Sequence, residues 1–483
     1  MRTWTGGIAR NGRGWAGGAA LAAAFAMTVP AASAVPLGGD LFTHDPSRIT
    51  QCDGKYYLYC TGPNCPMRVS KDMIHWTLGP GILNGVPAWA HQRVPKAKKD
   101  ETWIWAPDVI KVGSLYYLYY SFSTFGSKTS VIGLVTSPTL DPASPKYHWT
   151  DRGLVVATND SSNFNAIDPA PEFDAQGNLW LAFGSWNRGG IQLVKLDKAT
   201  GKPASKQYFV AGGQSTGPEA AYLWYRKPYY YLFENEGLCC QGLRSTYKIM
   251  VGRSKSVTGP YLDKDGRDLS KGGGTVFLAA RGNEIGPGHA GIITRGGASY
   301  LTFHYYDGKD NGRPSLGMEK LVMTKDGWPD VGYKPPHFSY DLPDGTYAIV
   351  SKATGLALTV HGNSDTDGAS LDQSPYTRDK HQQWKVARTN DGFYRITSVA
   401  NGKVVDLWYC KPEDGTKIDQ FKWLDNACQR WKIEKQPGGT FRVLSQGGGG
   451  AMTVPSGHAG PGTEIQEFTY KRSANQQWIF KRP

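Results

Sequence analysis

The segment KYYLYC, Lys55–Cys60, is the first of five aromatic stretches that decide the fold of this chain. Each is a short run of aromatic and apolar residues, a pattern typical of buried β-strands. The other four stretches are LYYLYYS (115–121), LWLAFGS (179–185), YYYLFEN (229–235) and SYLTFHY (299–305). They follow one another at a mean spacing of roughly sixty residues, so one β-rich unit is repeated along the chain.

Glycine turns precede most of these strands, and little amphipathic helix separates them. Gly54, Gly113, Gly177 and Gly297 each lie shortly before an aromatic stretch. The repeat is long enough for a propeller blade of about four strands with its loops. We therefore predict a five-bladed β-propeller over residues 35–340, with a β-sandwich as the alternative.

A second repeat occupies the C-terminal part of the chain. HQQW, CQRW and NQQW end at Trp384, Trp431 and Trp478, 47 residues apart in each case. One copy is too small to bury a core, so the three copies must share one. The pattern resembles the ricin-type β-trefoil, a carbohydrate-binding module, over residues 344–483. The predicted fold class is all-β, with a Pro-rich connector at Tyr333–Gly345 between the two domains.

Residues 1–34 have the features of a secretory signal peptide. Arg2, Arg10 and Arg13 precede an apolar run over residues 19–29, and residues 32–34, Ala-Ser-Ala, form a cleavage site. The run is too short to cross a bilayer, and no later stretch is apolar enough to do so. We expect a secreted, extracellular monomer with no membrane partner.

The formal net charge is +13, or +10 without the three arginines of the signal segment. No Lys/Arg-rich run or basic helix is present, so we expect no nucleic-acid partner. A solvated basic surface explains most of this charge, and attraction to an acidic cell-wall polymer is the second interpretation.

Seven cysteines are too few for a disulfide framework in a chain of 483 residues. An exported chain can still oxidise some of them. Cys410 and Cys428 make the best pair because they lie in one C-terminal repeat. No Cys/His spacing resembles a zinc site.

Five residues occupy an equivalent place in the five repeats, about eight or nine positions before each turn. They are Asp45, Trp105, Asp168, Glu219 and His289. Equivalent positions on the innermost strands of a propeller converge on its axis, so these side chains are predicted to share one pocket. Asp141 stands before a proline, as Asp45 and Asp168 do, but falls outside this spacing and is interpreted as a loop turn.

Three carboxylates in one pocket repel one another and are costly to desolvate, so a structural role explains them poorly. Glycoside hydrolysis needs such a group. One acid protonates the leaving oxygen, and an ionised carboxylate activates water on the opposite face of the sugar. A third carboxylate can hold the pKa of the acid up and orient it. Trp105 offers an apolar face to the sugar ring.

Nine motifs in order resemble the endo-α-1,5-L-arabinanases of glycoside hydrolase family 43 over nearly the whole propeller. They are THDPS, WAPDV, YYSFSTFGSKTSVIGLVTS, NAIDP, LAFGSW, CCQG, YKIMVGRSKSVTGPY, GGGT and GPGH. The resemblance implies that Asp45 is the general base, Glu219 the general acid and Asp168 the residue that tunes and positions the acid. It also implies inversion of the anomeric configuration, which leaves room for a water between base and acid.

The resemblance implies further contacts with the substrate and one with an ion. Phe125, Asn165 and Ser185 join Trp105 as expected substrate-binding residues. His289 matches a histidine near the axis, where a calcium or other ion held mostly by water is expected to be structural, since the chemistry requires no cofactor. One departure is EAAY at 219–222, where the family has EAPY, and the loss of proline is expected to loosen the loop that carries the acid.

The sequence therefore predicts an endo-arabinanase that acts on α-1,5-linked L-arabinan, including arabinan attached to pectin. An exo-acting α-L-arabinofuranosidase or a β-xylosidase of the same family is the first alternative, because sequence does not show how the cleft is closed. A non-catalytic, lectin-like protein with two sugar-binding domains is the alternative from another class.

Sugar binding by the trefoil must be judged repeat by repeat. Ricin-type sites use an Asp after the first strand, a stacking aromatic residue and the Asn of N-Q-x-W. The second repeat keeps Asp406 with Phe421 and Trp423 nearby, although Cys428 takes the Asn position. The first repeat has Thr359 and His381 at these positions, and the third has Thr453 and Asn475. The second repeat is the best candidate.

Overall fold

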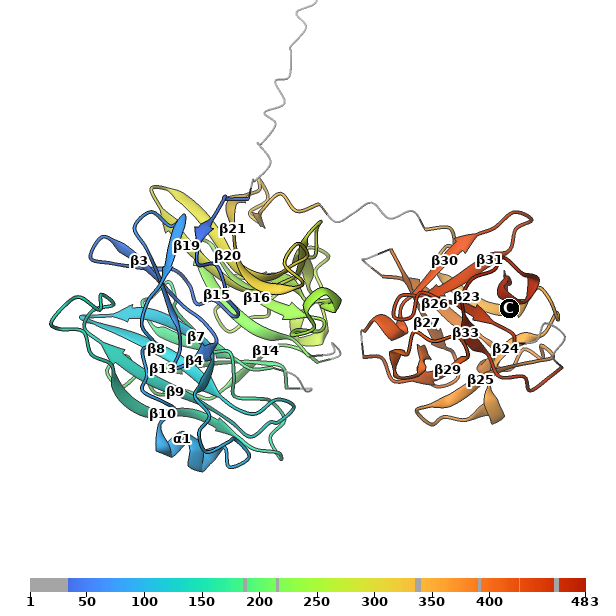
Figure 1. Cartoon of the computed structure of the whole chain (residues 1–483), viewed down its shortest axis with the longest axis horizontal. Helices are drawn as coiled ribbons and strands as arrows, with labels where there is room; N and C mark the ends of the chain where they lie inside the picture. Colours follow the sequence, from blue (N-terminus) through green and yellow to red (C-terminus); the bar gives the residue numbers. More distant parts are fainter. Residues whose placement is uncertain are drawn as a thin grey trace, which may run out of the picture. The chain divides into compact units, whose positions relative to one another are not determined.

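Five β-sheets follow one another along the N-terminal two thirds of the chain in a computed structural model of the protein (Figure 1). The structure describes residues 34–185, 189–213, 217–334, 340–389, 392–424, 426–455 and 460–483. The predicted signal peptide lies outside this range except for Ala34, as do residues 335–339 of the predicted connector and Trp186 of the LAFGSW motif. Among the described residues, none forms a helix that is long and apolar enough to cross a membrane.

The first two sheets have five strands each. The first contains β1 (Gly38–Gly39), β2 (Thr50–Cys52), β3 (Lys55–Tyr59), β5 (Met67–Ser70) and β6 (His75–Leu78). The second contains β4 (Gly62–Pro63), β7 (Trp103–Val112), β8 (Leu115–Phe122), β9 (Ser130–Ser137) and β10 (Thr150–Thr158). The short helix α1 (Ala88–Arg93) lies in the chain between β6 and β7.

The remaining three sheets have four strands each. The third sheet contains β11 (Ala170–Phe173), β12 (Leu179–Phe183), β13 (Ile191–Leu196) and β14 (Tyr208–Ala211). The fourth contains β15 (Glu219–Arg226), β16 (Tyr229–Glu236), β17 (Lys248–Ser254) and β18 (Thr275–Leu278). The fifth contains β19 (Glu284–Arg295), β20 (Ala298–Asp307), β21 (Arg313–Met323) and β22 (Pro329–Asp330). The predicted five-bladed propeller is confirmed, and each sheet is one blade.

The five aromatic stretches form β3, β8, β12, β16 and β20, each of which pairs with the innermost strand of its blade. Their side chains are almost fully buried, as Tyr57, Tyr119 and Phe233 illustrate. Large aromatic rings fill the wedge between neighbouring blades, and this burial is the main favourable contribution to folding.

The N-terminal segment joins the first blade to the last. The Val35 amide donates to the Met318 carbonyl at 2.9 Å, and the Leu316 amide donates to the Leu41 carbonyl at 2.8 Å. Strand β1 also pairs in parallel with β6 of the first blade. The same few residues therefore bond to both blade one and blade five, which closes the ring.

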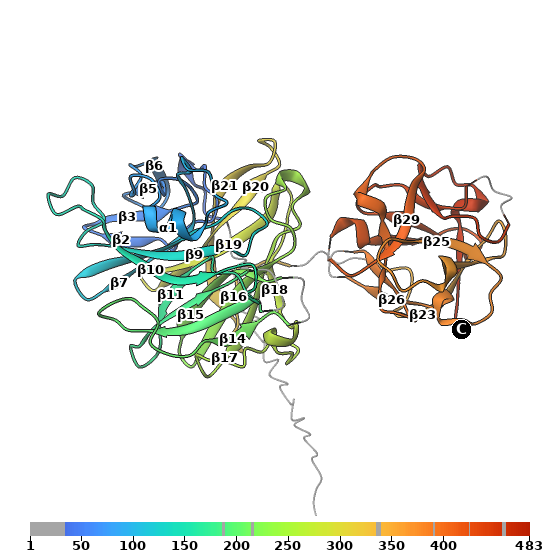
Figure 2. The ribbon, with the colours of Figure 1, turned by 90° about the horizontal axis from the view of Figure 1, so that it is seen from below.

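The C-terminal domain is a threefold unit of twelve strands, several of which are labelled in Figure 2. They are β23 (Gly345–Ser351), β24 (Ala357–Val360), β25 (Ala369–Ser374), β26 (Trp384–Arg388), β27 (Tyr394–Ser398), β28 (Val404–Leu407), β29 (Thr416–Phe421), β30 (Trp431–Lys435), β31 (Phe441–Ser445), β32 (Ala451–Thr453), β33 (Gln466–Phe468) and β34 (Trp478–Lys481). The predicted β-trefoil is confirmed, and with it the all-β class.

The Q-x-W repeats form the core of this trefoil. Trp384, Trp431 and Trp478 are fully buried, and their indole nitrogens donate to the carbonyls of Leu358, Val405 and Met452 at 3.1, 3.0 and 2.9 Å. The glutamines two positions before them accept from the amides of Thr377, Leu424 and Lys471. Each repeat thus closes its own loop with one glutamine and shares one tryptophan with the common core.

A disulfide joins Cys410 to Cys428 in the second trefoil repeat, as predicted. Cys52, Cys60 and Cys65 are unpaired and buried in the first blade region. Asp141 accepts from the Ala143 amide at 3.1 Å and pairs with Lys55, which confirms its interpretation as a turn residue.

A buried ion cluster on the propeller axis joins all five blades. The Arg48 guanidinium pairs with Asp108 at 2.8 Å and with Glu172 at 3.1 Å, and it also donates to the Pro171 carbonyl. It lies 5.0 Å from the centre of the Tyr222 ring, whose hydroxyl donates to the Ile292 carbonyl. Blades one to five therefore each contribute a group to one network.

Replacement of Arg48 by methionine should destabilise the propeller by about 3–5 kcal/mol, because the buried carboxylate of Asp108 and the partly buried one of Glu172 lose their cation. Calorimetric or urea-induced unfolding of the full chain measures this change. The matched control is Lys96→Met, which removes an exposed pair with Asp160 and should cost less than about 1 kcal/mol. Equal stability of the two variants would contradict a structural role for the cluster.

Candidate active site

One residue in the left-handed backbone region stands near the start of the innermost strand of every blade. These residues and their φ angles are Asp45 (48°), Ala106 (43°), Asp168 (57°), Ala220 (52°) and His289 (60°). The pairing of β7, β15 and β19 with the next strand is irregular at the same place. Such strained residues and bulges redirect side chains, and here they turn the predicted site residues toward the axis.

Each of these five strained amides donates a hydrogen bond to a side chain from the preceding blade. The Asp45 amide donates to His304 Nδ1 at 3.1 Å, and the Ala106 amide donates to Thr61 Oγ1 at 2.8 Å. The Asp168 amide donates to Ser121 Oγ and the Ala220 amide to Asp168 Oδ2, both at 2.9 Å. The His289 amide donates to Asn235 Oδ1 at 3.0 Å. A polar side chain in each blade therefore fixes the site residue of the next blade.

The structure brings the predicted carboxylates and histidine together. His289 Nδ1 lies 3.5 Å from Asp45 Oδ1, and Asp168 holds the amide that follows Glu219. The negative charges of Asp45 and Asp168 both raise the pKa of Glu219, which requires the three groups to be near one another. Their convergence is as the repeat spacing predicts, although the role of each residue stays a prediction.

Asp45 is held in its ionised form. Burial alone would raise the pKa of its carboxyl, but the charge of His44 and the hydrogen bonds from His289 and His44 hold it well below its usual value. His44 Nδ1 lies 2.9 Å from Asp45 Oδ2, and the Thr61 hydroxyl donates to the same oxygen at 2.7 Å. The pKa of His44 rises to about 10, because pairing with Asp45 outweighs the effect of its burial.

Glu219 is held in its protonated form. Burial and the negative charge of Asp168 raise the pKa of its carboxyl well above the usual value, while a hydrogen bond with Tyr247 opposes part of this rise. Burial also raises the pKa of Asp168, to about 6, although the nearby His289 lowers it. A pocket with one ionised and one protonated carboxyl can supply both a base and an acid.

Three residues of this site were not singled out in the sequence. His44 stands directly before Asp45, and His304 accepts from the Asp45 amide while its ring stacks on His44 at 4.2 Å. Tyr247 forms a hydrogen bond with Glu219. A Cβ at Gly288 would come within 2.3 Å of the Tyr247 ring, so the second glycine of GPGH makes room for this tyrosine. All three lie in stretches that the sequence analysis quotes, His44 in THDPS, Tyr247 at the start of YKIMVGRSKSVTGPY and His304 in SYLTFHY, but nothing in these stretches marked the individual residues.

The predicted substrate-binding residues differ in their surroundings. Trp105 is partly exposed in β7, and Phe125 is 82% exposed in the loop after β8. Asn165 and Ser185 are buried, and Asn165 Nδ2 donates to Ser185 Oγ at 3.3 Å. The aromatic pair therefore has free surface for a sugar, whereas the polar pair supports the pocket wall, and contact of these four residues with substrate stays a prediction.

The ligand atoms near His289 offer little to a calcium ion, which takes about six to eight oxygen ligands. Asp45 Oδ1, 3.5 Å from His289 Nδ1, could supply one ligand, and an ion held there mostly by water stays a prediction. A second group, His44, Asp45 and His304, has ligand atoms within 4.8 Å of one another. His44 Nδ1 pairs with the Asp45 carboxylate and His304 Nδ1 accepts from the Asp45 amide, so these three residues are hydrogen-bonded to one another.

In the trefoil, Asp406 lies in β28 directly opposite Asp419 of β29. Burial raises the pKa of Asp406 to about 6, although a hydrogen bond with Gln429 lowers it. Phe421 and Trp423 are partly exposed at and just after the end of β29, and the Arg395 guanidinium lies 5.1 Å from the centre of the Trp423 ring. The three residues predicted to bind sugar thus come from neighbouring parts of one repeat.

Comparison with known proteins agrees with both domains. Residues 39–329 match the family Glycosyl hydrolases family 43, and residues 337–421 match the family of ricin-type beta-trefoil lectin domain-like proteins. A relative from Bacillus subtilis (strain 168), an extracellular endo-α-(1→5)-L-arabinanase, is 41% identical over 64% of this chain and 95% of its own length. The extracellular exo-α-(1→5)-L-arabinofuranosidase ArbA of Cellvibrio japonicus is 39% identical over 60% of this chain and 86% of its own.

A solved structure extends this likeness to three dimensions. The α-L-arabinanase of Cellvibrio cellulosa, determined in complex with arabinohexaose, is 38% identical. The match covers 60% of this chain and 95% of that one, with a TM-score of 0.57. Since the family match spans more than half of the sequence, the chain belongs to glycosyl hydrolases family 43 and is a glycoside hydrolase, not a non-catalytic lectin.

Proposed function

We propose that this protein is an endo-acting, inverting arabinanase that cleaves the α-1,5-L-arabinofuranosidic bonds of arabinan. The observation that carries the proposal is the opposite shift of two carboxyl pKa values in one pocket, downward for Asp45 and upward for Glu219. Inverting glycosidases need this difference, because base and acid act at the same moment on opposite faces of the sugar. Relatives with arabinanase activity in their names support the choice of substrate.

In the proposed mechanism, Asp45 takes a proton from a water molecule, whose oxygen attacks the anomeric carbon. Glu219 gives its proton to the departing glycosidic oxygen. His44 keeps Asp45 ionised before the reaction, and ionised Asp168 keeps the proton on Glu219. Trp105 packs against the sugar ring. No step needs a cofactor, and we propose that any calcium near His289 is structural.

Replacement of Glu219 by glutamine should lower kcat on linear arabinan by about a hundredfold or more, because the leaving oxygen no longer receives a proton. Reducing-end release by the purified full chain measures the loss. The wild-type protein should keep its full rate in the same assay after dialysis against a chelator, because no proposed step needs a metal ion. A Glu219→Gln variant with wild-type activity would show that another group is the acid.

The products of the wild-type enzyme distinguish endo from exo action. Early mixtures of arabino-oligosaccharides from linear arabinan would support the endo mode. Arabinose alone would favour an exo-acting arabinofuranosidase, which the relation to ArbA makes the second candidate. Release from arabinoxylan but not from arabinan would instead support a β-xylosidase.

Replacement of Asp168 by asparagine should move the basic limb of the kcat/KM profile to lower pH by about one unit. A negative charge opposes ionisation of its neighbour, so its removal lowers the pKa of Glu219. The amide oxygen can still accept from Ala220. The matched control is Asp141→Asn, which also precedes a proline but lies outside the site, and it should leave the profile unchanged. An unmoved basic limb in the Asp168 variant would contradict the proposed charge coupling.

We further propose that the protein is a secreted monomer whose trefoil holds it on polysaccharide. The extracellular names of two relatives support export. The basic net charge favours arabinan attached to acidic pectin. Binding to native pectin should therefore weaken with added salt, and an unchanged affinity would contradict this preference. Light scattering after size-exclusion chromatography tests the monomer.

Within the trefoil, Asp406→Asn should weaken retention of the full chain on insoluble arabinan by about tenfold, the effect of one hydrogen bond from a charged group. The Glu219→Gln background prevents digestion of the matrix during the measurement. The control is Asp365→Asn, an exposed aspartate of the first repeat, which should bind as before. Equal retention of both variants would show that the second repeat is not the binding site.

A further inference from the structure

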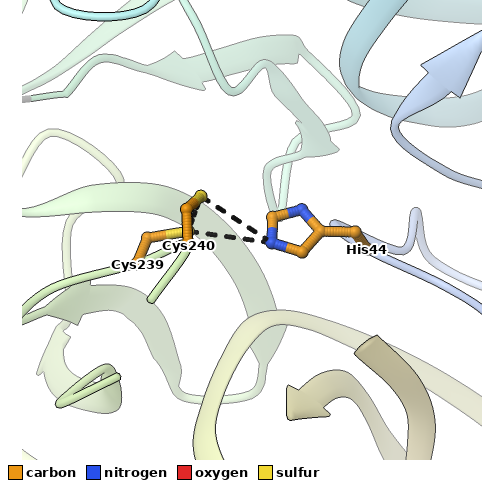
Figure 3. Close-up of side chains that lie close together, drawn as sticks. All are labelled: His44, Cys239 and Cys240. Carbon is orange, nitrogen blue, oxygen red and sulfur yellow. Dashed lines mark hydrogen bonds between the residues drawn. The ribbon is translucent and has the colours of Figure 1, made fainter. Parts of the chain in front are cut away.

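Two adjacent cysteines, Cys239 and Cys240, face the pocket from the loop that follows β16. Their sulfur atoms are 2.6 Å apart, and both lie close to His44 Nε2, at 3.8 and 3.9 Å (Figure 3). Non-bonded heavy atoms attract at about 3.5–4.0 Å, and a disulfide bond is about 2.05 Å long. The sulfurs are therefore much closer to a bond than to an ordinary contact.

The loop holds the two sulfurs in this arrangement from both sides. The Leu238 amide donates to the Thr246 hydroxyl at 3.0 Å, and the Cys240 amide donates to the Tyr306 hydroxyl at 2.7 Å. Gly237 has a φ of 92°, and a Cβ there would lie 2.4 Å from the Thr246 carbonyl oxygen. Cys240 itself has a φ of 63°, a strained value for a residue with a side chain.

As thiols, these cysteines would suit the site poorly. Hydrogen bonds from Cys239 and His44 lower the pKa of Cys240 to about 5, so the reduced pair carries a thiolate. This anion would join the ionised carboxylates of Asp45 and Asp168, and it would compete with Asp45 for the charge of His44. The sulfurs are also too close together to hold a metal ion between them.

We propose that Cys239 and Cys240 are oxidised to a vicinal disulfide that forms one wall of the substrate pocket beside His44 and Asp45. Cys240 is exposed and Cys239 partly so, which leaves the pair open to an oxidant and to a bound sugar. An exported protein meets oxidising conditions in which disulfides form and persist.

The oxidant is another disulfide, either a small molecule or a thiol–disulfide oxidoreductase. The Cys240 thiolate attacks one of its sulfurs, forms a mixed disulfide and releases one thiolate. Cys239 then loses its proton to solvent and attacks Cys240 Sγ, which closes the ring and releases the second thiolate. The two cysteines lose two electrons and two protons in total, and the oxidant becomes two thiols.

The consequence for catalysis rests on the proposed arabinan function. An oxidised pair has no S–H group and no charge, and it presents two polarizable sulfurs to the apolar face of a sugar. His44 then keeps its contacts with Asp45 and Tyr306 without a thiolate partner. Reduction should lower kcat/KM on a short linear arabino-oligosaccharide about tenfold, a change of ~1.4 kcal/mol.

Peptide mapping of the full chain tests the bond directly. The protein is produced by export, denatured without reductant, treated with a maleimide and digested with trypsin. The peptide 227–244 contains Cys239 and Cys240 and no other cysteine. We expect it without label and lighter by two hydrogens than the reduced peptide. Two maleimide labels on this peptide would overturn the proposal.

Kinetics test the effect of the bond on the pocket. Wild type should lose activity with a phosphine reductant and regain it with a small-molecule disulfide. The double variant Cys239→Ser/Cys240→Ser should not respond to either reagent. The control Cys410→Ser/Cys428→Ser, which lacks the trefoil disulfide, should respond as wild type does.

An oxidised peptide with unchanged kinetics on reduction would overturn the role in the pocket. Failure to hydrolyse any arabinan would count against the proposed function alone, since the mapping does not depend on it.

Discussion

Five hydrogen bonds between blades set both the shape of the propeller and the geometry of its active site. In each blade, a residue with a left-handed backbone has its amide bound by a side chain of the blade before it. Such backbone conformations cost about 1–3 kcal/mol each and persist only where the surroundings enforce them. The ring supplies these surroundings, because every blade stands between two others. A site residue is therefore fixed by its neighbour in the ring rather than by its own strand.

Two layers along the axis use this geometry for different ends. The lower layer is formed by residues three or four positions after the site residues, and in it Arg48 forms ion pairs with Asp108 and Glu172. The upper layer contains the acids Asp45, Asp168 and Glu219, and the imidazoles of His44 and His289 lie beside Asp45. Burial and the charge of Asp168 raise the pKa of Glu219, while His44 and His289 lower that of Asp45, a separation that chemistry requires and stability does not. The Arg48 layer holds the blades together, so the catalytic layer beside it can remain strained.

The fold and the main site residues could be predicted because both follow from local repeats. Alternating aromatic strands at a regular spacing identify the blades, and the place of Asp45, Asp168 and Glu219 within each repeat brings them to the axis. His304 and Tyr247 could not be found in this way. Tyr247 stands at the start of YKIMVGRSKSVTGPY and His304 in SYLTFHY, both outside the repeat position that marks the site residues. The pairing of Asp108 with Arg48 could not be predicted either, since ion pairing across blades leaves no mark in the sequence.

The missing proline after Glu219 shows how the ring can replace local rigidity. The family that the sequence resembles has EAPY, so a proline stands there where this chain has Ala221, and its loss was expected to loosen the segment. Here the strained amide of Ala220 donates to Asp168, and Ala221 is buried. The carboxylate that holds the proton on the acid thus also fixes the backbone beside it. Protonation of Asp168 would weaken both effects together, because a neutral carboxyl is the poorer acceptor and no longer opposes ionisation of Glu219. In this chain the position and the protonation state of the acid therefore depend on the same charge.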